Sequence, residues 1–450
     1  MLALAFLACQ CVAIACSVNG PFLDEAVNAT VGLQLLRGRP GDFGWLGGSV
    51  YAYPVLVGAA YAAGGLAGAR LVTALLYTLA LWLFSRFSSR LVGPTASLFA
   101  TGLLAVNGIW FSIAHLAVYD ALAMAALCGA AWAAVEMART QRLRWALAAG
   151  LWSALAVIAK YPTVIALLPV AGLAFTASRR RPSLQLIAAS LGIATIAVTA
   201  YMLLAHGFLI PRVALTQAVG EPSIFDQSTL AYQAAYTLAL PLALAIPGAL
   251  RVFRKRPALV IVLVAGSLIW PILHVVMERY QSLSKDSAFG FIELYPLAGV
   301  SVSELWRERR RVVAGVLGVA ISWGFAQCYW QDRSWGDIRP VVAFIVPELQ
   351  PTDRVALEHG WAFSMYAVLA GRLPSPAAVI DRYRYEHGED VCDAQWIIGT
   401  RHSPLDTSDP LVRAAESCQF KLVRSFPYEF YSPVPPLVRH LEWEYQVYRR

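Results

Sequence analysis

The chain has 450 residues, of which 58% are hydrophobic and only 14% are charged. Soluble domains have about 25% charged residues, so the composition excludes an ordinary soluble protein and indicates a polytopic α-helical membrane protein. The net charge is +8, but Lys and Arg collect in short clusters between apolar runs. That pattern is typical of membrane-orientation signals and gives no reason to expect a nucleic-acid partner.

Eleven apolar segments are predicted to cross the membrane, because a bilayer core needs about 20 apolar residues per helix. Their ranges are 1–19, 66–85, 91–107, 117–137, 145–159, 162–177, 184–204, 229–250, 258–277, 288–304 and 312–330. The first segment has no basic flank and no clear cleavage site, so we expect it to remain as a helix. Pro162 marks a break between two short segments, and the glycines of "GGLAG", residues 64–68, are interpreted as helix-packing positions.

Five basic clusters separate these segments, and consecutive clusters are always two predicted spans apart. They are Arg86 with Arg90, Arg139 with Arg142 and Arg144, Arg179 to Arg181, Arg251 with Arg254 to Arg256, and Arg307 with Arg309 to Arg311. All five are therefore expected on one face, which the positive-inside rule makes cytoplasmic. This arrangement predicts a cytoplasmic N-terminus and an external C-terminus. Without an organelle-targeting signal, it favours a bacterial inner membrane.

The first outer loop, 20–53, opens with an acid pair in "NGPFLDEAVNATVGLQLLRG". Apolar residues recur there with helical spacing and Gly38 is a plausible stop, so a helix along the outer interface is predicted. Asp24 and Asn28 are four residues apart and share a face of this helix. Asp24 and Glu25 could carry chemistry, or they could simply be first-turn acids that the helix dipole favours.

Two more charges fall at the outer ends of predicted spans. Burying an ionisable side chain such as that of Asp120 at or near bilayer depth costs free energy, so a functional role is the default hypothesis for it. The alternative is that Asp120 caps a helix. Lys160, beside Tyr161, is the only charge between Arg144 and Arg179. A lysine there could bind a phosphate as a point charge, although a snorkelling side chain is the simpler alternative.

The outer loops 206–228 and 278–290 are also rich in polar residues. Arg279 and Lys285 of the second loop could bind an anionic head group, and an ordinary solvated loop is the alternative. No histidine shows metal-ligand spacing. No nucleophile-elbow motif supports a Ser–His–Asp site.

After residue 330 the charge density becomes ordinary, and short β-like runs alternate with helical ones. We therefore divide the chain into a transmembrane domain, 1–330, and a small extracytoplasmic α/β domain, 331–450. Cys392 and Cys418 lie in the second domain. They are expected to form a disulfide if that domain faces an oxidising compartment.

Several short motifs occur in succession along the first 205 residues. They are "FLDEA", "VYAYPVLVGAAYAAGG", "ARLVTALLYTLALWLF", "AHLAVYDALAMAALCGAAW" and "GLWSALAVIAKYPTVIALLP". This succession resembles the GT-C membrane glycosyltransferases, in particular the branch that contains aminoarabinose transferases and protein O-mannosyltransferases. Beyond those residues the resemblance is only architectural.

The resemblance implies an inverting glycosyltransferase that uses a sugar on a polyprenyl phosphate at the outer face, with an envelope lipid, glycan or protein as acceptor. It makes Asp24 the catalytic acidic residue, with Glu25 beside it and Asp120 as a second pocket carboxylate. Lys160 would contact the lipid phosphate. The substrate-binding candidates are Lys160, Tyr161, Tyr53, Asn28, Arg279 and Lys285. If a divalent metal ion takes part, Asp24 and Asp120 are its candidate ligands.

A lipid-linked sugar flippase or transporter is the alternative function. Such a protein should line a path through the membrane with ionisable groups near mid-depth and paired broken helices, whereas these predicted spans carry almost no mid-depth charge. The glycosyltransferase hypothesis depends on one spatial expectation, namely that Asp24, Asp120 and Lys160 converge in a single cavity on the outer side.

Overall fold

The computed structural model describes residues 1–17, 20–38, 51–118, 120–178, 182–218, 227–277, 283–333, 335–357, 360–375, 378–381, 384–385, 388–403, 410–432 and 439–450. The chain forms two compact units. The helical unit comprises Met1–Ala15, Trp45–Tyr53 and Arg70–Cys328. The mixed unit comprises Cys16–Gly44, Pro54–Ala69 and Tyr329–Arg450. It therefore includes parts of the chain that the sequence assigned to the transmembrane domain.

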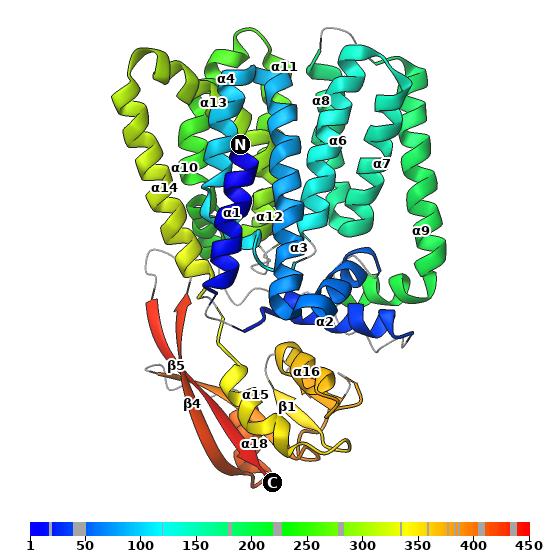
Figure 1. Ribbon diagram of the computed structural model, residues 1–450, viewed down its shortest axis with the longest axis vertical. Coiled ribbons are helices and arrows are strands. Elements are labelled where there is room, and N and C mark those ends of the chain that lie inside the picture. Colours follow the sequence, from blue (N-terminus) through cyan, green and yellow to red (C-terminus); the bar gives the residue numbers. More distant parts are fainter. Residues whose placement is uncertain are drawn as a thin grey trace. The chain divides into compact units, whose positions relative to one another are not determined.

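The helical unit is a bundle of apolar helices (Figure 1). Its elements are α1 (Leu2–Ala15), most of α3 (Ala52–Val92), α4 (Pro94–Ala105), α5 (Gly108–Ile113), α6 (Asp120–Thr140), α7 (Leu143–Ala159), η1 (Tyr161–Val164), α8 (Leu167–Thr176), α9 (Leu184–Ala218), α10 (Gln227–Phe253), α11 (Pro257–Val276), α12 (Leu283–Ser287), η2 (Ala288–Gly290), α13 (Phe291–Glu308) and α14 (Arg310–Gln331). Helix α6 packs against α7 and α8, α7 packs against α9, and α13 packs against α4 and α10.

Every predicted apolar segment overlaps a helix, and the chain is a multi-pass membrane protein. Within the described ranges, six helices are long and apolar enough to cross a bilayer: α3, α6, α9, α10, α11 and α14. Others are shorter. Helix α4 has 12 residues and extends about 18 Å at ~1.5 Å per residue, against a hydrocarbon core of about 30 Å. The count of eleven spans therefore stays a prediction.

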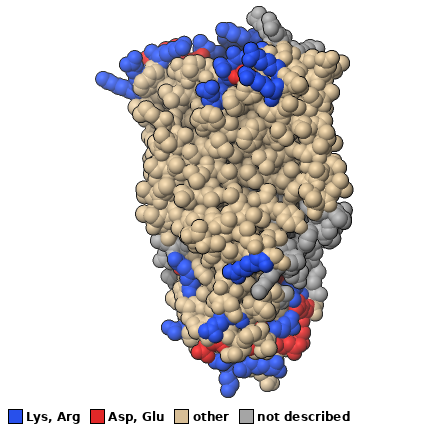
Figure 2. All heavy atoms as spheres, turned by 45° about the vertical axis from the view of Figure 1, so that its right-hand side comes forward, with Lys and Arg blue, Asp and Glu red and all other residues tan. Residues whose placement is uncertain are grey.

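The basic clusters gather at one end of the helical unit. Arg90 Nε lies 2.6 Å from Glu136 Oε1, which joins the first cluster to the end of α6. Arg251 Nε lies 2.5 Å from Glu304 Oε1, which joins the fourth cluster to the fifth. Figure 2 shows a broad band of surface without charged side chains and a dense group of Lys and Arg at its upper edge, while Lys, Arg, Asp and Glu are mixed beyond its lower edge. The third cluster, 179–181, lies outside the described residues, and the compartment that this end faces stays a prediction.

Arg256 also has a structural role that charge patterning does not reveal. Its guanidinium donates to the carbonyl oxygens of Leu91, Thr176 and Ala177 at 3.3, 3.0 and 2.5 Å. These carbonyls lie at the C-terminal ends of α3 and α8, where the last carbonyl groups of a helix have no hydrogen-bond partner within the helix. One guanidinium at the start of α11 thus joins three helices.

We expect Arg256→Ala to lower the free energy of unfolding by about 1.5–3 kcal/mol, the usual contribution of hydrogen bonds to charged groups. Arg256→Lys should recover only part of this loss, because an ammonium lacks the planar fork of donors. The measurement is the thermal midpoint of the detergent-purified protein. Arg254→Ala, which removes an exposed charge from the same cluster, should leave that midpoint unchanged, and an equal effect of both variants would contradict the role of Arg256.

Helix α3 is broken at Gly64 and Gly65. Gly65 has a φ of +60°, in the left-handed region that favours glycine. A Cβ atom at either position would meet no atom within 4 Å, so neither glycine is needed for packing, and Gly65 is needed for its backbone conformation. Their interpretation as packing positions was wrong. Gly68 does allow a close approach, since a Cβ there would lie 2.4 Å from the carbonyl oxygen of Ala60.

The mixed unit contains a five-stranded sheet in the order β2-β1-β3-β5-β4. Its strands are β1 (Val355–Leu357), β2 (Val379–Asp381), β3 (Trp396–Ser403), β4 (Lys421–Ser432) and β5 (Arg439–Arg449). The first three are mutually parallel, and β5 runs antiparallel to both β3 and β4. The helices of this unit are α2 (Leu23–Leu36), α15 (Arg339–Ile345), η3 (Val346–Glu348), α16 (Gly360–Leu369) and α18 (Pro410–Ser417).

Side chains of the parallel strands alternate between two buried faces, as the period of a strand requires. Val355 and Leu357 point into a core with α15 and α16. Ala356 and Ile397 point into a second core with α18. The small C-terminal α/β fold is therefore confirmed. Strand β5 was missed, although Leu441, Trp443, Tyr445 and Val447 alternate with polar residues in "RHLEWEYQVYR", which is the period of a half-buried strand.

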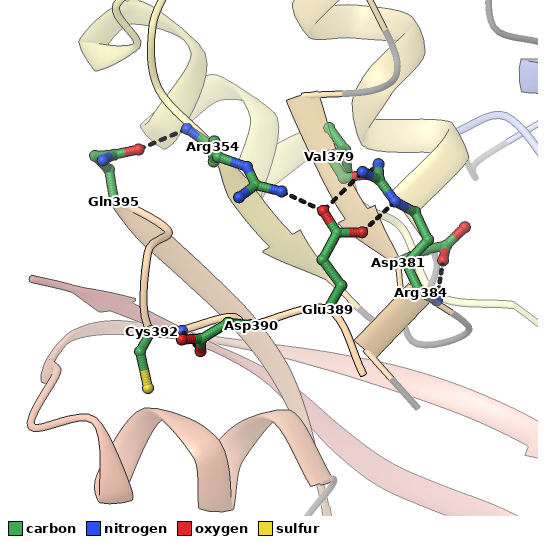
Figure 3. A network of polar contacts seen from close by, with 8 residues as sticks. All are labelled: Arg354, Val379, Asp381, Arg384, Glu389, Asp390, Cys392 and Gln395. Atoms are coloured by element: carbon green, nitrogen blue, oxygen red, sulfur yellow. Dashed lines mark hydrogen bonds and ion pairs between the residues drawn. The ribbon is translucent and has the colours of Figure 1, made fainter. Parts of the chain in front are cut away.

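A polar network and a disulfide stabilise the connection between β2 and β3 (Figure 3). Glu389 accepts hydrogen bonds from Arg354 and, at 2.6 Å, from Arg384 Nε. Cys392 and Cys418 form a disulfide with Cα atoms 5.5 Å apart, the pair that the sequence predicted. Structural disulfides persist in oxidising compartments, which agrees with the predicted external location.

Candidate functional site

Lys160 lies in a short break between two helices. Helix α7 ends at Ala159, and Pro162 follows in η1, where it has no amide hydrogen to continue the helix. The Lys160 backbone is extended, with φ −153° and ψ 101°. Its carbonyl accepts hydrogen bonds from the amide and hydroxyl of Thr163 at 2.9 and 2.7 Å. Because of this break, the Lys160 side chain lies inside the helical unit and is 4% exposed.

The Lys160 ammonium lies between two buried carboxylates. Its Nζ atom is 2.6 Å from Oδ1 of Asp120, the first residue of α6, and also donates to Oδ1 of Asp286 on α12. The same Nζ atom lies 5.0 Å from the centre of the Phe289 ring, a cation–π distance. The two carboxylates are 40 and 126 positions away along the chain, so tertiary packing creates this arrangement.

Two further side chains complete what we call the Lys160 cluster: Asp120, Lys160, His274, Lys285 and Asp286. His274 Nε2 lies 2.9 Å from Asp286 Oδ2, and Lys285 Nζ lies 3.5 Å from Asp120 Oδ2. Burial raises the pKa of Asp286, but Lys160 and the hydrogen-bonded His274 more than offset it, and that pKa lies below its ordinary value. The cluster thus places two lysine side chains against two carboxylates.

The two lysines differ in what they can offer a ligand. Lys160 is nearly fully buried and engages both carboxylates, so it is mainly an internal counter-ion. Lys285 makes the longer contact with Asp120 and is 13% exposed at its side chain. An incoming phosphate can reach a partly exposed ammonium more easily than an enclosed one, so the difference in exposure favours Lys285 over Lys160 as the phosphate contact. Both assignments stay predictions.

The Lys160 cluster does not fit a divalent metal ion. Among the described residues, no group of three or more His, Cys, Asp or Glu side chains is placed to hold one. Asp120 has a lysine ammonium near each of its carboxylate oxygens, and these positive charges would repel a cation at short range. The role of Asp24 as a metal ligand stays a prediction.

The acid pair lies on α2, in the mixed unit. Asp24 is 4% exposed and Glu25 is fully buried. The Glu25 carboxylate accepts the backbone N–H of Phe22 at 2.8 Å, which satisfies a donor at the start of the helix. Asn28 donates from Nδ2 to the Asp24 carbonyl at 2.7 Å. Glu25 therefore has a capping role, which leaves Asp24 as the better candidate for chemistry. Convergence of Asp24 with the Lys160 cluster stays a prediction.

Helix α2 is closely packed within its unit. A Cβ at Gly32 would lie 1.8 Å from the Pro54 carbonyl oxygen, and a Cβ at Gly58 would lie 2.4 Å from the Gly32 carbonyl carbon. These two glycines therefore allow the backbones of α2 and the first part of α3 to touch. Helix α2 also packs against α16. The helix that carries Asp24 is consequently buried over most of its length.

The remaining predicted site residues have different outcomes. The Tyr53 hydroxyl lies 2.7 Å from Thr73 Oγ1, inside the helical unit. Tyr161 begins η1 beside Lys160 and is partly exposed. Arg279 lies outside the described residues. Their substrate-binding roles stay predictions.

Sequence reasoning gave no individual role to several buried ionisable residues, among them Arg70, His274, Asp286 and Glu293. Arg70, His274 and Glu293 lie within segments that were predicted to span the membrane, where an ionisable residue is a functional hypothesis by default. That rule could have found these three. Asp286 had no such signal, because its pairing with His274 depends on how α11 and α12 meet.

Comparisons with known proteins agree with this architecture. Residues 51–206, which include Tyr53, Asp120 and Lys160, match the dolichyl-phosphate-mannose-protein mannosyltransferase family. No curated protein sequence matches the chain. The structure of ArnT from Cupriavidus metallidurans is similar, in the apo state and bound to undecaprenyl phosphate. In both states the TM-score is 0.60 at 13% identity; the apo match covers 99% of this chain and 97% of ArnT.

The archaeal oligosaccharyltransferase AglB from Archaeoglobus fulgidus, in complex with an inhibitory peptide and a dolichol-phosphate, is also similar. The TM-score is 0.55 at 11% identity over 96% of this chain and 80% of AglB. Such low identities establish a shared fold and leave substrates open. With the family match over residues 51–206, they support the GT-C membrane-glycosyltransferase fold that the sequence predicted for this chain.

Proposed function

We propose that the protein is an inverting glycosyltransferase that moves a sugar from a polyprenyl phosphate to an envelope acceptor on the extracytoplasmic face of a bacterial inner membrane. The observation that carries this proposal is the position of the Lys160 cluster. Helix α6 runs from Asp120 to the basic residues near Thr140, and α7 returns from Leu143 to Lys160. The 21 residues of α6 extend about 30 Å, so the cluster lies about one bilayer core away from the basic clusters.

The similar proteins support the substrate class. ArnT is bound to undecaprenyl phosphate in one structure and AglB to a dolichol-phosphate in another. A lipid phosphate at the membrane surface needs a cation near the outer end of the helices, and Lys285 of the Lys160 cluster meets that need.

In the proposed reaction, Asp24 accepts the proton of the acceptor hydroxyl as a general base. The acceptor oxygen forms a bond to the anomeric carbon while the bond from that carbon to the phosphate oxygen breaks. The lipid phosphate leaves with the electron pair, and Lys285 stabilises its negative charge. Because attack and departure occur on opposite sides, the anomeric configuration inverts.

A purified-protein assay tests this proposal against the transporter alternative. Proteoliposomes containing the protein would receive undecaprenyl phosphate carrying radiolabelled mannose or aminoarabinose, together with extracted envelope lipids, glycans and proteins. We expect label to appear covalently attached to an acceptor, with opposite anomeric configuration to the donor. Movement of labelled donor across the bilayer with no covalent product would refute the proposal.

A further inference from the structure

Three residues ahead of the C-terminal sheet hold the chain where it enters α2. We call Trp335, Asp337 and Arg339 the Gly20 clasp. Asp337 Oδ1 accepts a hydrogen bond from the Gly20 N–H at 3.2 Å, and Trp335 Nε1–H donates to the Gly20 carbonyl at 3.4 Å. Both polar groups of the Gly20 backbone are therefore bound by residues 315 and 317 positions further along the chain.

The clasp is itself rigid. Arg339 Nε lies 2.8 and 3.0 Å from the two carboxylate oxygens of Asp337, and Arg339 Nη2 lies 2.8 Å from Oδ2. The hydrogen bond with Asp337 raises the pKa of Arg339. Gly20 fits closely against this pair, since a Cβ there would lie 3.0 Å from Asp337 Oδ1 and 3.3 Å from Arg339 Cγ.

A short chain of contacts joins the clasp to Asp24. The Phe22 ring meets the Trp335 ring in an edge-on arrangement with centroids 5.3 Å apart. The Phe22 N–H in turn donates to the Glu25 carboxylate. Asp24 lies between these two anchored residues, in the first turn of α2. Movement of the clasp would therefore move the Asp24 side chain.

We propose that Asp337, supported by Trp335 and Arg339, is a positioning residue that holds Asp24 where it can act on the acceptor. This inference rests on the proposed function, in which Asp24 is the general base. A base must lie within hydrogen-bond reach of the proton that it removes, and a displacement of about 1 Å can cost ~10²-fold in rate. The C-terminal segment thereby takes part in catalysis by ordering a helix of the first outer loop.

The test compares three variants of the full-length protein: Asp337→Ala, Asp337→Asn and Glu348→Ala. Hydrogen–deuterium exchange of peptides covering 20–30 reports the order of the first turns of α2, and steady-state transfer reports catalysis. Asparagine keeps an oxygen that can accept the Gly20 N–H. Glu348→Ala removes a half-exposed ion pair with Arg449, at 3.6 Å, elsewhere in the same unit, and is the matched control.

In Asp337→Ala we expect the backbone amide hydrogens of residues 20–30 to exchange with deuterium faster than in the wild type. We expect kcat to fall roughly tenfold to a hundredfold, with the KM for the undecaprenyl-phosphate sugar changed by less than about threefold. Asp337→Asn and Glu348→Ala should resemble the wild type in both measurements. With wild-type transfer intact, unchanged exchange or unchanged kcat in Asp337→Ala overturns the positioning role alone. Absence of transfer by the wild type overturns the proposed function itself, so the two failures are distinguishable.

Discussion

Asp24→Asn is expected to reduce sugar transfer by about 10²–10⁴-fold, the usual contribution of a general base. The amide keeps the shape of the carboxylate but cannot accept the acceptor proton at neutral pH. The Gly20 N–H donates to Asp337, the Phe22 N–H donates to Glu25, and Asn28 Nδ2 donates to the Asp24 carbonyl. Because these hydrogen bonds are unchanged in the variant, α2 should remain folded. The measurement is kcat for transfer from the undecaprenyl-phosphate sugar, normalised to the amount of monodisperse purified protein.

Glu304→Gln is the matched control for this variant. It removes a carboxylate that pairs with Arg251 at the basic end of the helical unit, and it should leave transfer unchanged. Near-normal transfer by Asp24→Asn, at normal expression, would remove Asp24 from the mechanism. The fold assignment would be unaffected, since it depends on other observations.

Lys160→Met should strongly destabilise the helical unit. It would leave Asp120 and Asp286 facing each other as buried charges without their shared cation. Removing one partner of a buried ion pair typically lowers the free energy of unfolding by about 3–5 kcal/mol. That loss is a large fraction of the total free energy of unfolding of a protein. We expect a strong fall in folded yield from membranes and a lower thermal midpoint in detergent.

Two comparisons separate this effect from loss of a substrate contact. Arg251→Met breaks a largely exposed ion pair with Glu304 and should lower the free energy of unfolding by only about 0–1 kcal/mol. Lys285→Met should destabilise the fold less than Lys160→Met, because Asp120 keeps Lys160 as a partner, and it should raise the KM for the lipid-linked donor, because Lys285 is the more exposed cation of the cluster. If Lys160→Met folded as well as Arg251→Met and only weakened donor binding, Lys160 would be the phosphate contact after all.

These variants assign different tasks to residues that look alike in the sequence. Lys160 and Lys285 are both predicted on the outer face, yet one is enclosed by carboxylates and the other is partly exposed. Asp24 and Glu25 are adjacent acids, yet Glu25 is engaged in capping α2. A capping glutamate three residues after the N-cap is a local pattern that sequence can predict. The partners of the two lysines have no local pattern.

Much of the architecture follows from local properties of the chain. The length of each apolar run identifies a helix, and Pro162, which has no amide hydrogen to donate, marks a break between two helices. Helical spacing predicts a helix that stops near Gly38, where the structure has α2, Leu23–Leu36. The short motifs of the first 205 residues were sufficient to indicate the GT-C superfamily. Each of these features depends on residues within a few positions of one another, so no knowledge of packing was required.

The candidate site depends on distances that a linear pattern does not encode. Lys160 meets Asp286 across 126 positions, and Asp337 meets Gly20 across 317. A buried ion pair is stable only when packing excludes water and aligns donor with acceptor. Which carboxylate neutralises which lysine, and which residue holds the start of α2, are therefore consequences of how the helices and the sheet pack.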